Sequence, residues 1–412
     1  MTPIKTYQEA LSFLYARLPM FQRDGKAALH LKLDRIEALM EYLGNPHKRF
    51  KSIHVAGTNG KGSVSHSIAS VLQEAGYRTG LYTSPHLRDF RERIRLSGAL
   101  LPEAQVVDFV NAHHSYIETH RLSFFELTVA IAFETFASES VDVAVIEVGM
   151  GGSLDATNVI TPELSVITNI GFDHMEFLGD TLDKIAVEKA GIIKPGIPVV
   201  IGEHQSETLP VFSRIADGAG APLLSAWNYE EAIALSREID FDLKGVYQAS
   251  NRLTALTALL KLRELGWSIS DDHLKSGLSR VVTNTGLKGR WQWLNMNTVC
   301  DTAHNQAGLT QVMNQLRSMK YHQLHIVLGV VADKDLSLVL PLFIKEATYY
   351  FVKPDVPRGL DANVLVAKAL KYGLNGEVYD SVSLGLRAAQ SAATEQDLVF
   401  VGGSTFTVAE VV

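Results

Sequence analysis

The sequence predicts an α/β protein with two domains, a larger P-loop-type domain built on a parallel sheet and then a smaller Rossmann-like α/β domain. Three observations lead to this prediction. Short apolar runs of strand length alternate with helical stretches, a glycine-rich turn follows the first run, and the alternation restarts after a polar segment near residue 284. Such alternation gives a largely parallel sheet that helices cover on both faces. With 412 residues, the chain is also longer than one ordinary domain.

The first part of the chain supplies the larger sheet. Residues 1–50 predict helices, because apolar side chains recur at helical spacing up to Leu43, where glycine and proline end the run. Strands are then expected at 51–57, 79–83, 141–148, 164–169 and 197–201, and helices at 62–75, 103–119, 124–139 and 180–190. Ligands of such sheets bind at the carboxyl ends of the strands.

The second domain follows a polar, glycine-bearing segment at 283–290. We place the boundary near residue 284 and expect domains over 1–283 and 284–412. After it, the expected strands lie around Val299 and at 324–328, 349–352 and 398–401. No internal repeat, heptad array or low-complexity tract argues for another architecture.

Composition narrows the class of function. Hydrophobic residues make up 46% of the chain and charged residues 20%, as in compact soluble proteins. The net charge of −7 gives no general attraction to nucleic acid, although a local site can still bind a small charged ligand. The single cysteine, Cys300, excludes an internal disulfide and a thiolate metal cluster, and we expect it to be buried. The start of the sequence does not have the pattern of an export signal, so we expect a cytoplasmic protein. No apolar run reaches the roughly 20 residues that span a bilayer, so we expect no transmembrane helix.

The most informative segment is the glycine-rich turn after the first predicted strand. It can direct backbone N–H groups and a helix N-terminus at phosphate oxygens. Lys61 would neutralise the β and γ phosphates, and Ser63 would bind magnesium. The standard P-loop pattern is not matched, because position 55 is Val and Gly62 separates Lys61 from Ser63. An ordinary glycine-rich turn is the alternative. The candidate nucleotide-binding residues are Gly57, Thr58, Asn59, Gly60, Lys61, Gly62 and Ser63.

Acidic and histidine side chains follow the next strands of the predicted sheet. Glu147 ends one strand, so it is a candidate magnesium ligand or a strand-terminal surface acid. Asp155 lies just beyond, either in a substrate or phosphate site or as a solvated turn residue. Asp173 and His174 follow a third strand. A neutral imidazole can bind metal, so His174 is a candidate ligand of a second magnesium, with a structural role as the alternative.

Four further residues allow two interpretations each. Lys189 is either a helix-surface cation, which the residues alone favour, or a lysine brought to the active edge by its helix. Arg290, Asp301 and His304 form either a nucleotide clamp in the second domain or a linker arginine, a helix cap and a turn histidine.

Several motifs together resemble the folylpolyglutamate synthase and dihydrofolate synthase family of the Mur ligase superfamily. The resemblance covers nearly the whole chain and rests on the order of its motifs, which are GTNGKGS at 57–63, TSPHL at 83–87, FRERIR at 90–95, EVGMGGSLDATN at 147–158, FDH at 172–174, EKAGIIKPG at 188–196 and DTAHN at 301–305. The resemblance implies an ATP- and magnesium-dependent ligase. Such an enzyme joins L-glutamate to dihydropteroate and to folate through an acyl phosphate.

The resemblance also implies roles for individual residues. Two magnesium sites would be held by Ser63, Glu147 and His174, and Lys189 would be carbamylated. The resemblance further implies ATP binding by Asn251, Arg290 and Asp301, and a substrate loop of Ser84, Pro85 and His86 with Phe124 and Glu126 behind it. With the positions read above, the candidate catalytic residues are Lys61, Lys189 and His304, and the candidate substrate residues also include Phe124 and Asp155.

Three other functions remain open at this point. The chain could add glutamate to folates only, could be another Mur-type ligase with a different acid substrate, or could be a P-loop nucleotide switch that hydrolyses ATP without making an amide. Nothing in the sequence requires a partner subunit, so a monomer is expected.

Overall fold

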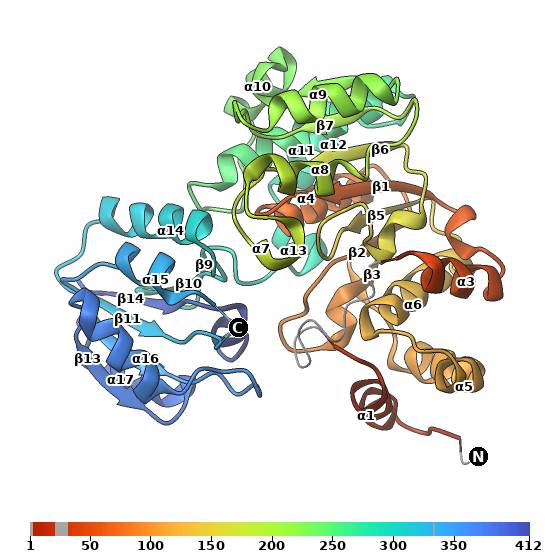
Figure 1. Cartoon of the computed structure of the whole chain (residues 1–412). Coiled ribbons are helices and arrows are strands. Elements are labelled where there is room, and N and C mark those ends of the chain that lie inside the picture. Colours follow the sequence, from red (N-terminus) through yellow and green to blue (C-terminus); the bar gives the residue numbers. More distant parts are fainter. Residues whose placement is uncertain (1–2, 21–31, 333) are drawn as a thin grey trace. The chain divides into compact units, whose positions relative to one another are not determined.

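The computed structural model describes residues 3–20, 32–332 and 334–412. The chain divides into two compact units (Figure 1). The first contains Met1–Asp242 and Ser250–Gly286, and the second Leu243–Ala249 and Leu287–Val412. The division at 286/287 lies just beyond the predicted boundary at 284, because helix α13 (Val281–Thr285) continues through that position and packs against helix α4 (Lys61–Glu74) of the first unit. The segment 243–249 was not expected in the second unit.

The first unit contains, within the described residues, an eight-stranded sheet of order β4-β3-β2-β5-β1-β6-β7-β8. Neighbouring strands from β2 to β8 are parallel, and β3 and β4 continue the sheet in antiparallel pairing beyond β2. The largely parallel sheet is therefore confirmed. Its strands are β1 (Lys51–Ala56), β2 (Thr79–Tyr82), β3 (Ile94–Leu96), β4 (Ala99–Leu100), β5 (Val143–Glu147), β6 (Leu164–Ile167), β7 (Val199–Ile201) and β8 (Leu223–Ser225).

Helices cover this sheet. Helix α4 packs against β1, β2 and β5, and α12 and α13 pack on α4. Successive side chains of β5 point to opposite faces, and its Ala144 and Ile146 join a core cluster with Phe133 and Phe136 of α6. The helices are α1 (Tyr7–Arg17), α3 (Asp34–Tyr42), α4 (Lys61–Glu74), α5 (Glu103–Thr119), α6 (Phe124–Ser138), α7 (Met175–Leu178), α8 (Leu182–Ala190), α9 (Leu209–Gly218), α10 (Glu230–Glu238), α11 (Gln248–Glu264), α12 (Asp271–Leu278) and α13. The rest of the helical start predicted for 1–50 includes residues 21–31, which lie outside the described residues.

The second unit has a smaller α/β fold. Its described residues form a six-stranded sheet of order β13-β12-β11-β14-β10-β9, parallel except for the β10/β9 pair. Its strands are β9 (Gln292–Trp293), β10 (Thr298–Cys300), β11 (Leu324–Leu328), β12 (Thr348–Val352), β13 (Gly376–Tyr379) and β14 (Leu398–Gly402). Its helices are α14 (Gln306–Ser318), α15 (Leu336–Val339), α16 (Ala362–Ala369), α17 (Val382–Ala392) and α18 (Thr405–Ala409).

Two expectations from composition can be compared with the structure. Cys300 is buried as expected, and burial raises the pKa of its thiol to about 12. In the part of the chain that the structure describes, no helix combines the length and apolar character needed to cross a membrane.

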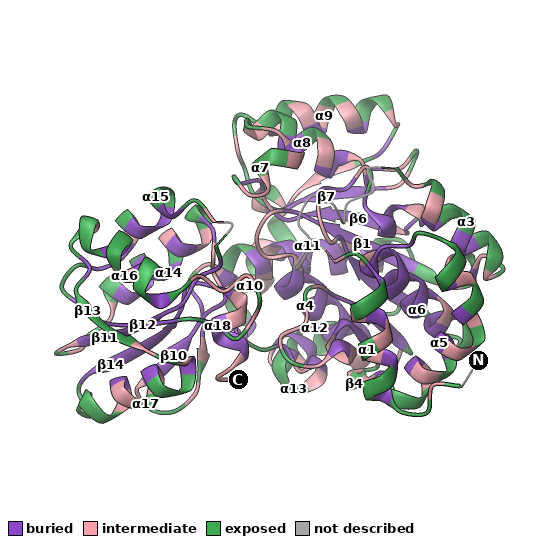
Figure 2. Ribbon diagram, turned by 60° about the horizontal axis from the view of Figure 1, so that its bottom comes forward, coloured by how far each residue is buried: buried purple, intermediate pink, exposed green. Residues whose placement is uncertain are grey.

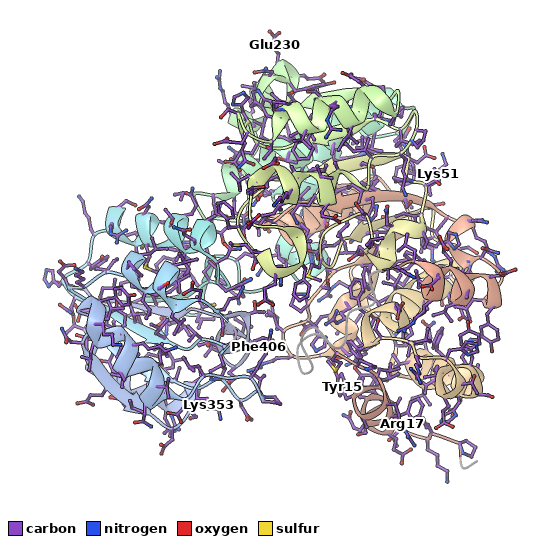
Figure 3. All side chains as sticks on the ribbon, in the orientation of Figure 1. Tyr15, Arg17, Lys51, Glu230, Lys353 and Phe406 are labelled. Carbon is purple, nitrogen blue, oxygen red and sulfur yellow. The ribbon has the colours of Figure 1, made fainter. Side chains whose placement is uncertain are left out.

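The parallel strands of the first unit place several loops at one edge of the sheet. The strands β6, β7 and β1 are largely buried (Figure 2), so the loops that follow them are the positions where polar side chains can meet solvent and ligands. Lys51, labelled in Figure 3, begins β1 at the opposite edge, where its ammonium lies 3.7 Å from the carboxylate of Glu163. The loops that follow β2, β5, β1 and β6 therefore come together at the carboxyl edge.

Candidate active site

The loop between β1 and α4 has the geometry of an anion-binding turn. Gly57 and Gly60 adopt φ angles of 142° and 86°, which glycine reaches without strain. Helix α4 begins at Lys61, and Gly60 at its N-cap offers no side-chain hydrogen bond to the first turn. The N–H groups of such a turn carry a partial positive charge that suits phosphate oxygens. The loop predicted from the sequence therefore lies between a strand and a helix N-terminus.

The segment after β6 holds this loop in place. The backbone N–H groups of Thr58 and Asn59 donate to the carbonyl and side-chain oxygens of Asn169, over 2.8 and 3.0 Å. The Thr168 hydroxyl donates to the Asn59 carbonyl over 2.6 Å. A Cβ atom on Gly57 would lie 1.8 Å from Thr168 Oγ1, so no side chain fits there. Thr168 and Asn169 were not selected from the sequence, although their place at the end of the strand predicted at 164–169 was a usable signal.

Two lysines contact the same carbonyl of the loop. Lys61 Nζ donates to the Gly57 oxygen over 3.0 Å and to the Thr58 oxygen over 3.1 Å. Lys189 Nζ reaches the Gly57 oxygen from α8 over 2.9 Å. Lys189 is only 4% exposed, so its interpretation as a surface cation is wrong.

The environment of Lys189 favours its neutral form. Burial, and next the charge of Lys61, lower the pKa of Lys189 from 10.5 to about 7, against the opposing effects of Asp173, Asp155 and Glu188. The amine is therefore partly uncharged at neutral pH. A free lysine would be almost wholly protonated there.

Asn251 is brought to the loop by α11. Its side chain is buried, and a Cβ atom on Gly60 would lie 2.2 Å from Asn251 Oδ1. The predicted ATP-binding residue Asn251 and the phosphate loop are thus in direct contact within the first unit.

Glu147 connects the loops that follow two adjacent strands. It ends β5, is 4% exposed, and its Oε2 accepts a 2.9 Å hydrogen bond from the Ser84 N–H. Because β2 and β5 are neighbours, the Ser84 loop and Glu147 meet at the same edge. The alternative of a surface acid is wrong.

The predicted metal ligands have suitable chemistry for magnesium. Ser63 lies buried in the first turn of α4, and His174 stands directly before α7. Among the described residues, no group of three or more histidine, cysteine or acidic side chains could hold a metal alone. Magnesium commonly takes one or two protein oxygens and completes its shell with phosphates and water. Ser63 and Glu147 fit that pattern.

Asp155 organises the loop that follows Glu147. Its Oδ2 accepts from the N–H groups of Gly149 and Met150 over 3.0 and 2.9 Å, and its Oδ1 accepts from the Thr157 N–H over 3.0 Å. Burial raises the pKa of Asp155. A solvated turn residue is therefore excluded, and the substrate role of Asp155 stays a prediction.

The predicted substrate residues form a second cluster. His86, on the loop with Ser84 and Pro85, accepts a 2.7 Å hydrogen bond at Nδ1 from Arg93 Nε, and the Arg93 guanidinium lies 5.4 Å from the centre of the Phe124 ring. Arg93 lies in the motif FRERIR at 90–95, but it was not predicted from the sequence as a site residue. Glu126 caps α6, because its Oε2 accepts from the Ser123 N–H over 2.7 Å.

The second unit gathers its own predicted residues. Asp301 is buried, and its Oδ2 accepts from the Trp291 N–H over 2.7 Å and from the Tyr247 hydroxyl. Arg290 donates to the Thr302 hydroxyl, and His304 Nδ1 lies 2.9 Å from the Thr302 carbonyl. Tyr247 was missed, because no motif marks it. The roles of Arg290, Asp301 and His304 toward ATP stay predictions.

Comparisons with known proteins agree with these motifs. The Mur ligase middle domain matches residues 55–201, and the Mur ligase glutamate ligase domain matches residues 289–405. A folylpolyglutamate synthase from Lacticaseibacillus casei is 32% identical over 96% of both chains. A dihydrofolate synthase/folylpolyglutamate synthase from Bacillus subtilis is 32% identical over 98% of both chains. The chain belongs to the folylpolyglutamate synthase/dihydrofolate synthase family.

Solved structures of this family extend the agreement to the fold. Escherichia coli FolC in complex with DHPP and ADP has a TM-score of 0.86 at 29% identity, covering 100% of this chain and 98% of that one. A bifunctional folylpolyglutamate synthase/dihydrofolate synthase with Mn, AMPPNP and L-glutamate bound has a TM-score of 0.82 at 28% identity, with the same coverage. A relative from Haloferax volcanii is called a probable bifunctional folylpolyglutamate synthase/dihydropteroate synthase. The chain is 32% identical to it and spans only 50% of its length.

Membership in the folylpolyglutamate synthase/dihydrofolate synthase family confirms the class of enzyme. The chain is an ATP-dependent amide ligase that acts on small molecules and uses a divalent metal.

Proposed function

We propose that this ligase is a bifunctional dihydrofolate synthase/folylpolyglutamate synthase, which joins L-glutamate to dihydropteroate and to tetrahydrofolate. The observation that carries the proposal is the phosphate loop, where Lys61 and Lys189 donate to one Gly57 carbonyl beside the N-terminus of α4. The names of relatives about 30% identical over nearly the full chain support both activities. We further propose that the enzyme acts as a monomer in the cytoplasm.

The residues of the loop favour an acyl phosphate route. The substrate carboxylate attacks the γ-phosphorus of ATP, so that a new O–P bond forms while the bond to ADP breaks. The glutamate amine then attacks the activated carbonyl, and inorganic phosphate and a proton leave. Lys61 and the first-turn N–H groups of α4 stabilise the phosphoryl charge, and the Asn251 side chain lies against the loop at Gly60. Positioning and charge, without a nucleophilic side chain, therefore suffice for catalysis.

Magnesium, when bound, offsets the charge that develops on the transferred phosphoryl group. We propose that Ser63 and Glu147 hold one ion and that His174 contributes to a second. The burial of Glu147 and its bond to the Ser84 N–H would fix its carboxylate beside the substrate loop.

We also propose that Lys189 is carbamylated. Its uncharged amine would add to CO2, forming an N–C bond and releasing one proton, and the product would be an anionic carbamate. The lowered pKa supplies the neutral amine that this addition requires. The carbamate would exchange a second cation beside Lys61 for an anion able to position metal.

The decisive experiment measures glutamate-dependent ADP release with ATP and magnesium, and records product masses. Dihydropteroate, tetrahydrofolate and no acid are compared. One glutamate added to each acid is the expected result. Activity with tetrahydrofolate alone would limit the function to polyglutamylation, and activity with neither acid would contradict the proposal.

A matched variant shows whether the measured activity comes from this protein or from a contaminating host enzyme. Lys61→Met, purified identically, should lose glutamate-dependent turnover because it lacks the loop cation. ADP release that needs neither acid nor glutamate would instead favour a nucleotide switch.

A further inference from the structure

Arg93 is a buried arginine with an unusual set of neighbours. It ends the short 3-10 helix Phe90–Arg93 and is 3% exposed. Its Nε donates to His86 Nδ1 over 2.7 Å, and its guanidinium lies over the Phe124 ring. No ion pair joins Arg93 to a carboxylate within the described ranges. Arg91, two residues earlier, instead pairs with Asp89 over 2.8 Å and Glu103 over 3.4 Å. The nearest groups to the Arg93 guanidinium thus include an imidazole, an aromatic ring and the Tyr82 hydroxyl.

The bond from Arg93 determines the state of His86. An arginine can only donate, so Nδ1 of His86 must accept and the ring proton must sit on Nε2. A protonated ring would place its Nδ1–H against the Arg93 Nε–H, two donors facing one another, beside a second positive charge. Burial, followed by Arg93, lowers the pKa of His86 to about 3, with Asp89 acting in the opposite direction. His86 therefore stays neutral at physiological pH.

The surroundings of the pair reinforce this arrangement. The charged or titratable groups near it are Asp89 beside His86, and Tyr15, Tyr82 and Glu147 beside Arg93. Tyr15 of α1, labelled in Figure 3, has its ring centre 5.4 Å from that of Phe124. The other end of the loop is fixed, because the Ser84 N–H donates to Glu147. Both ends of the loop are thus tied to buried ionisable groups.

We propose that Arg93 is a positioning residue that holds His86 as a neutral Nε2–H donor for a hydrogen-bond acceptor of the acid substrate. The described part of the chain supplies no hydrogen-bond partner for His86 Nε2, which suits a ligand atom there. The inference rests on the proposed function, because it takes the 84–86 loop as the acid-binding loop. It assigns His86 to recognition, with no part in proton transfer.

The first test reads the tautomer directly. Nitrogen NMR of histidine-labelled enzyme should show His86 as the Nε2–H form, unchanged between pH 5.5 and 8, with an Nε2 shift when dihydropteroate is added. The His86→Asn variant assigns the signal. An Nδ1–H tautomer, a titration near 6.5 or no response to the acid would overturn the inference. This measurement needs no turnover, so it is independent of the proposed ligase activity.

The second test uses kinetics. Arg93→Met should raise KM for the acid about tenfold or more, and should add a pH step near 6 to 7 that is absent in the Arg93→Met/His86→Asn double variant. KM for ATP should stay within twofold. Arg91→Met is the matched control and should keep the wild-type profile. An unchanged acid KM and pH profile in a folded Arg93→Met enzyme would refute the inference, while activity of the wild type would leave the proposed function intact.

Discussion

Lys61 and Lys189 donate to the same carbonyl oxygen, that of Gly57, over 3.0 and 2.9 Å. One lysine comes from the first turn of α4 and the other from the last turn of α8. Burial makes the charged form of Lys189 costly, and the nearby ammonium of Lys61 repels a second positive charge. Both effects lower the pKa of Lys189 to about 7.

Removing the Lys189 amine should disable turnover. We expect Lys189→Ala to reduce glutamate-dependent ADP release about 100-fold or more, the usual scale for a positioned charged group. Formate or acetate should restore part of the activity by replacing the carbamate. Lys184→Ala, on the exposed side of α8, is the control and should behave as wild type. A fully active Lys189→Ala enzyme would dismiss carbamylation.

Stability should depend on pH through the same side chain. The folded pKa of Lys189 lies near 7 and the unfolded value near 10.5, so the unfolded chain binds more protons between these values. This lysine should therefore make the free energy of unfolding rise with pH in that window, by up to about 1.4 kcal/mol per pH unit. Urea unfolding at several pH values in CO2-free buffer would measure this rise in the free energy of unfolding. Lys189→Met should lack this contribution, and identical slopes in both proteins would contradict the expectation.

Two glycines at the ends of α4 give a matched pair of variants. Gly60 and Gly76 have φ angles of 86° and 85°, but a Cβ meets Asn251 Oδ1 at 2.2 Å only at Gly60, and nothing within 4 Å at Gly76. Gly60→Ala should raise KM for ATP at least about tenfold, because the loop must shift. Gly76→Ala carries only the backbone strain, of order 1 kcal/mol, and should keep its ATP affinity. Equal effects of the two changes on KM would show that crowding by Asn251 is unimportant.

Variants of the proposed metal ligands should change how turnover depends on the magnesium concentration. Glu147→Gln keeps the shape of the side chain and an acceptor for the Ser84 N–H but removes the charge. We expect turnover to fall about 100-fold and the magnesium requirement to rise, with unchanged circular dichroism. Ser63→Ala should act in the same direction. Glu163→Gln, at a partly exposed acid of the opposite sheet edge, is the control. Wild-type magnesium titrations in both site variants would reject these ligands.

Tyr247 should contribute to stability through Asp301. Its hydroxyl donates to a buried carboxylate, and Tyr247→Phe removes that donor without leaving a large cavity. The expected loss in the free energy of unfolding is about 1–3 kcal/mol, measured by urea denaturation. Tyr379→Phe removes an exposed hydroxyl that donates to Glu377 over 3.1 Å, and should cost far less. A loss no greater than that of the control would mean that Asp301 is satisfied without Tyr247.

The residues that could be predicted from the sequence are those placed by the order of the strands and by the glycine-rich turn. Gly57 to Ser63 and Glu147 end predicted strands, and parallel strands bring their ends to one edge whatever the details of packing. Burial is different, because it depends on elements distant in the sequence. The surface position that sequence favoured for Lys189 was wrong because the fold turns that face of α8 toward Gly57.

Side-chain pairings that no periodicity reveals explain the other omissions. Arg93 donates to His86 seven residues away, across an irregular loop. Tyr247 pairs with Asp301 across 54 positions.

The chain passes from one unit to the other three times, because Leu243–Ala249 belongs to the second unit while the residues on both sides belong to the first. A fragment that begins at Leu287 would therefore omit a piece of its own fold, including the hydroxyl that donates to Asp301. In that fragment the buried carboxylate of Asp301 would keep the backbone donors Trp291 and Ala303 but would lose the Tyr247 hydroxyl. A fusion that links Leu243–Ala249 to Leu287–Val412 and leaves out the residues between them is the sounder route to an isolated C-terminal module.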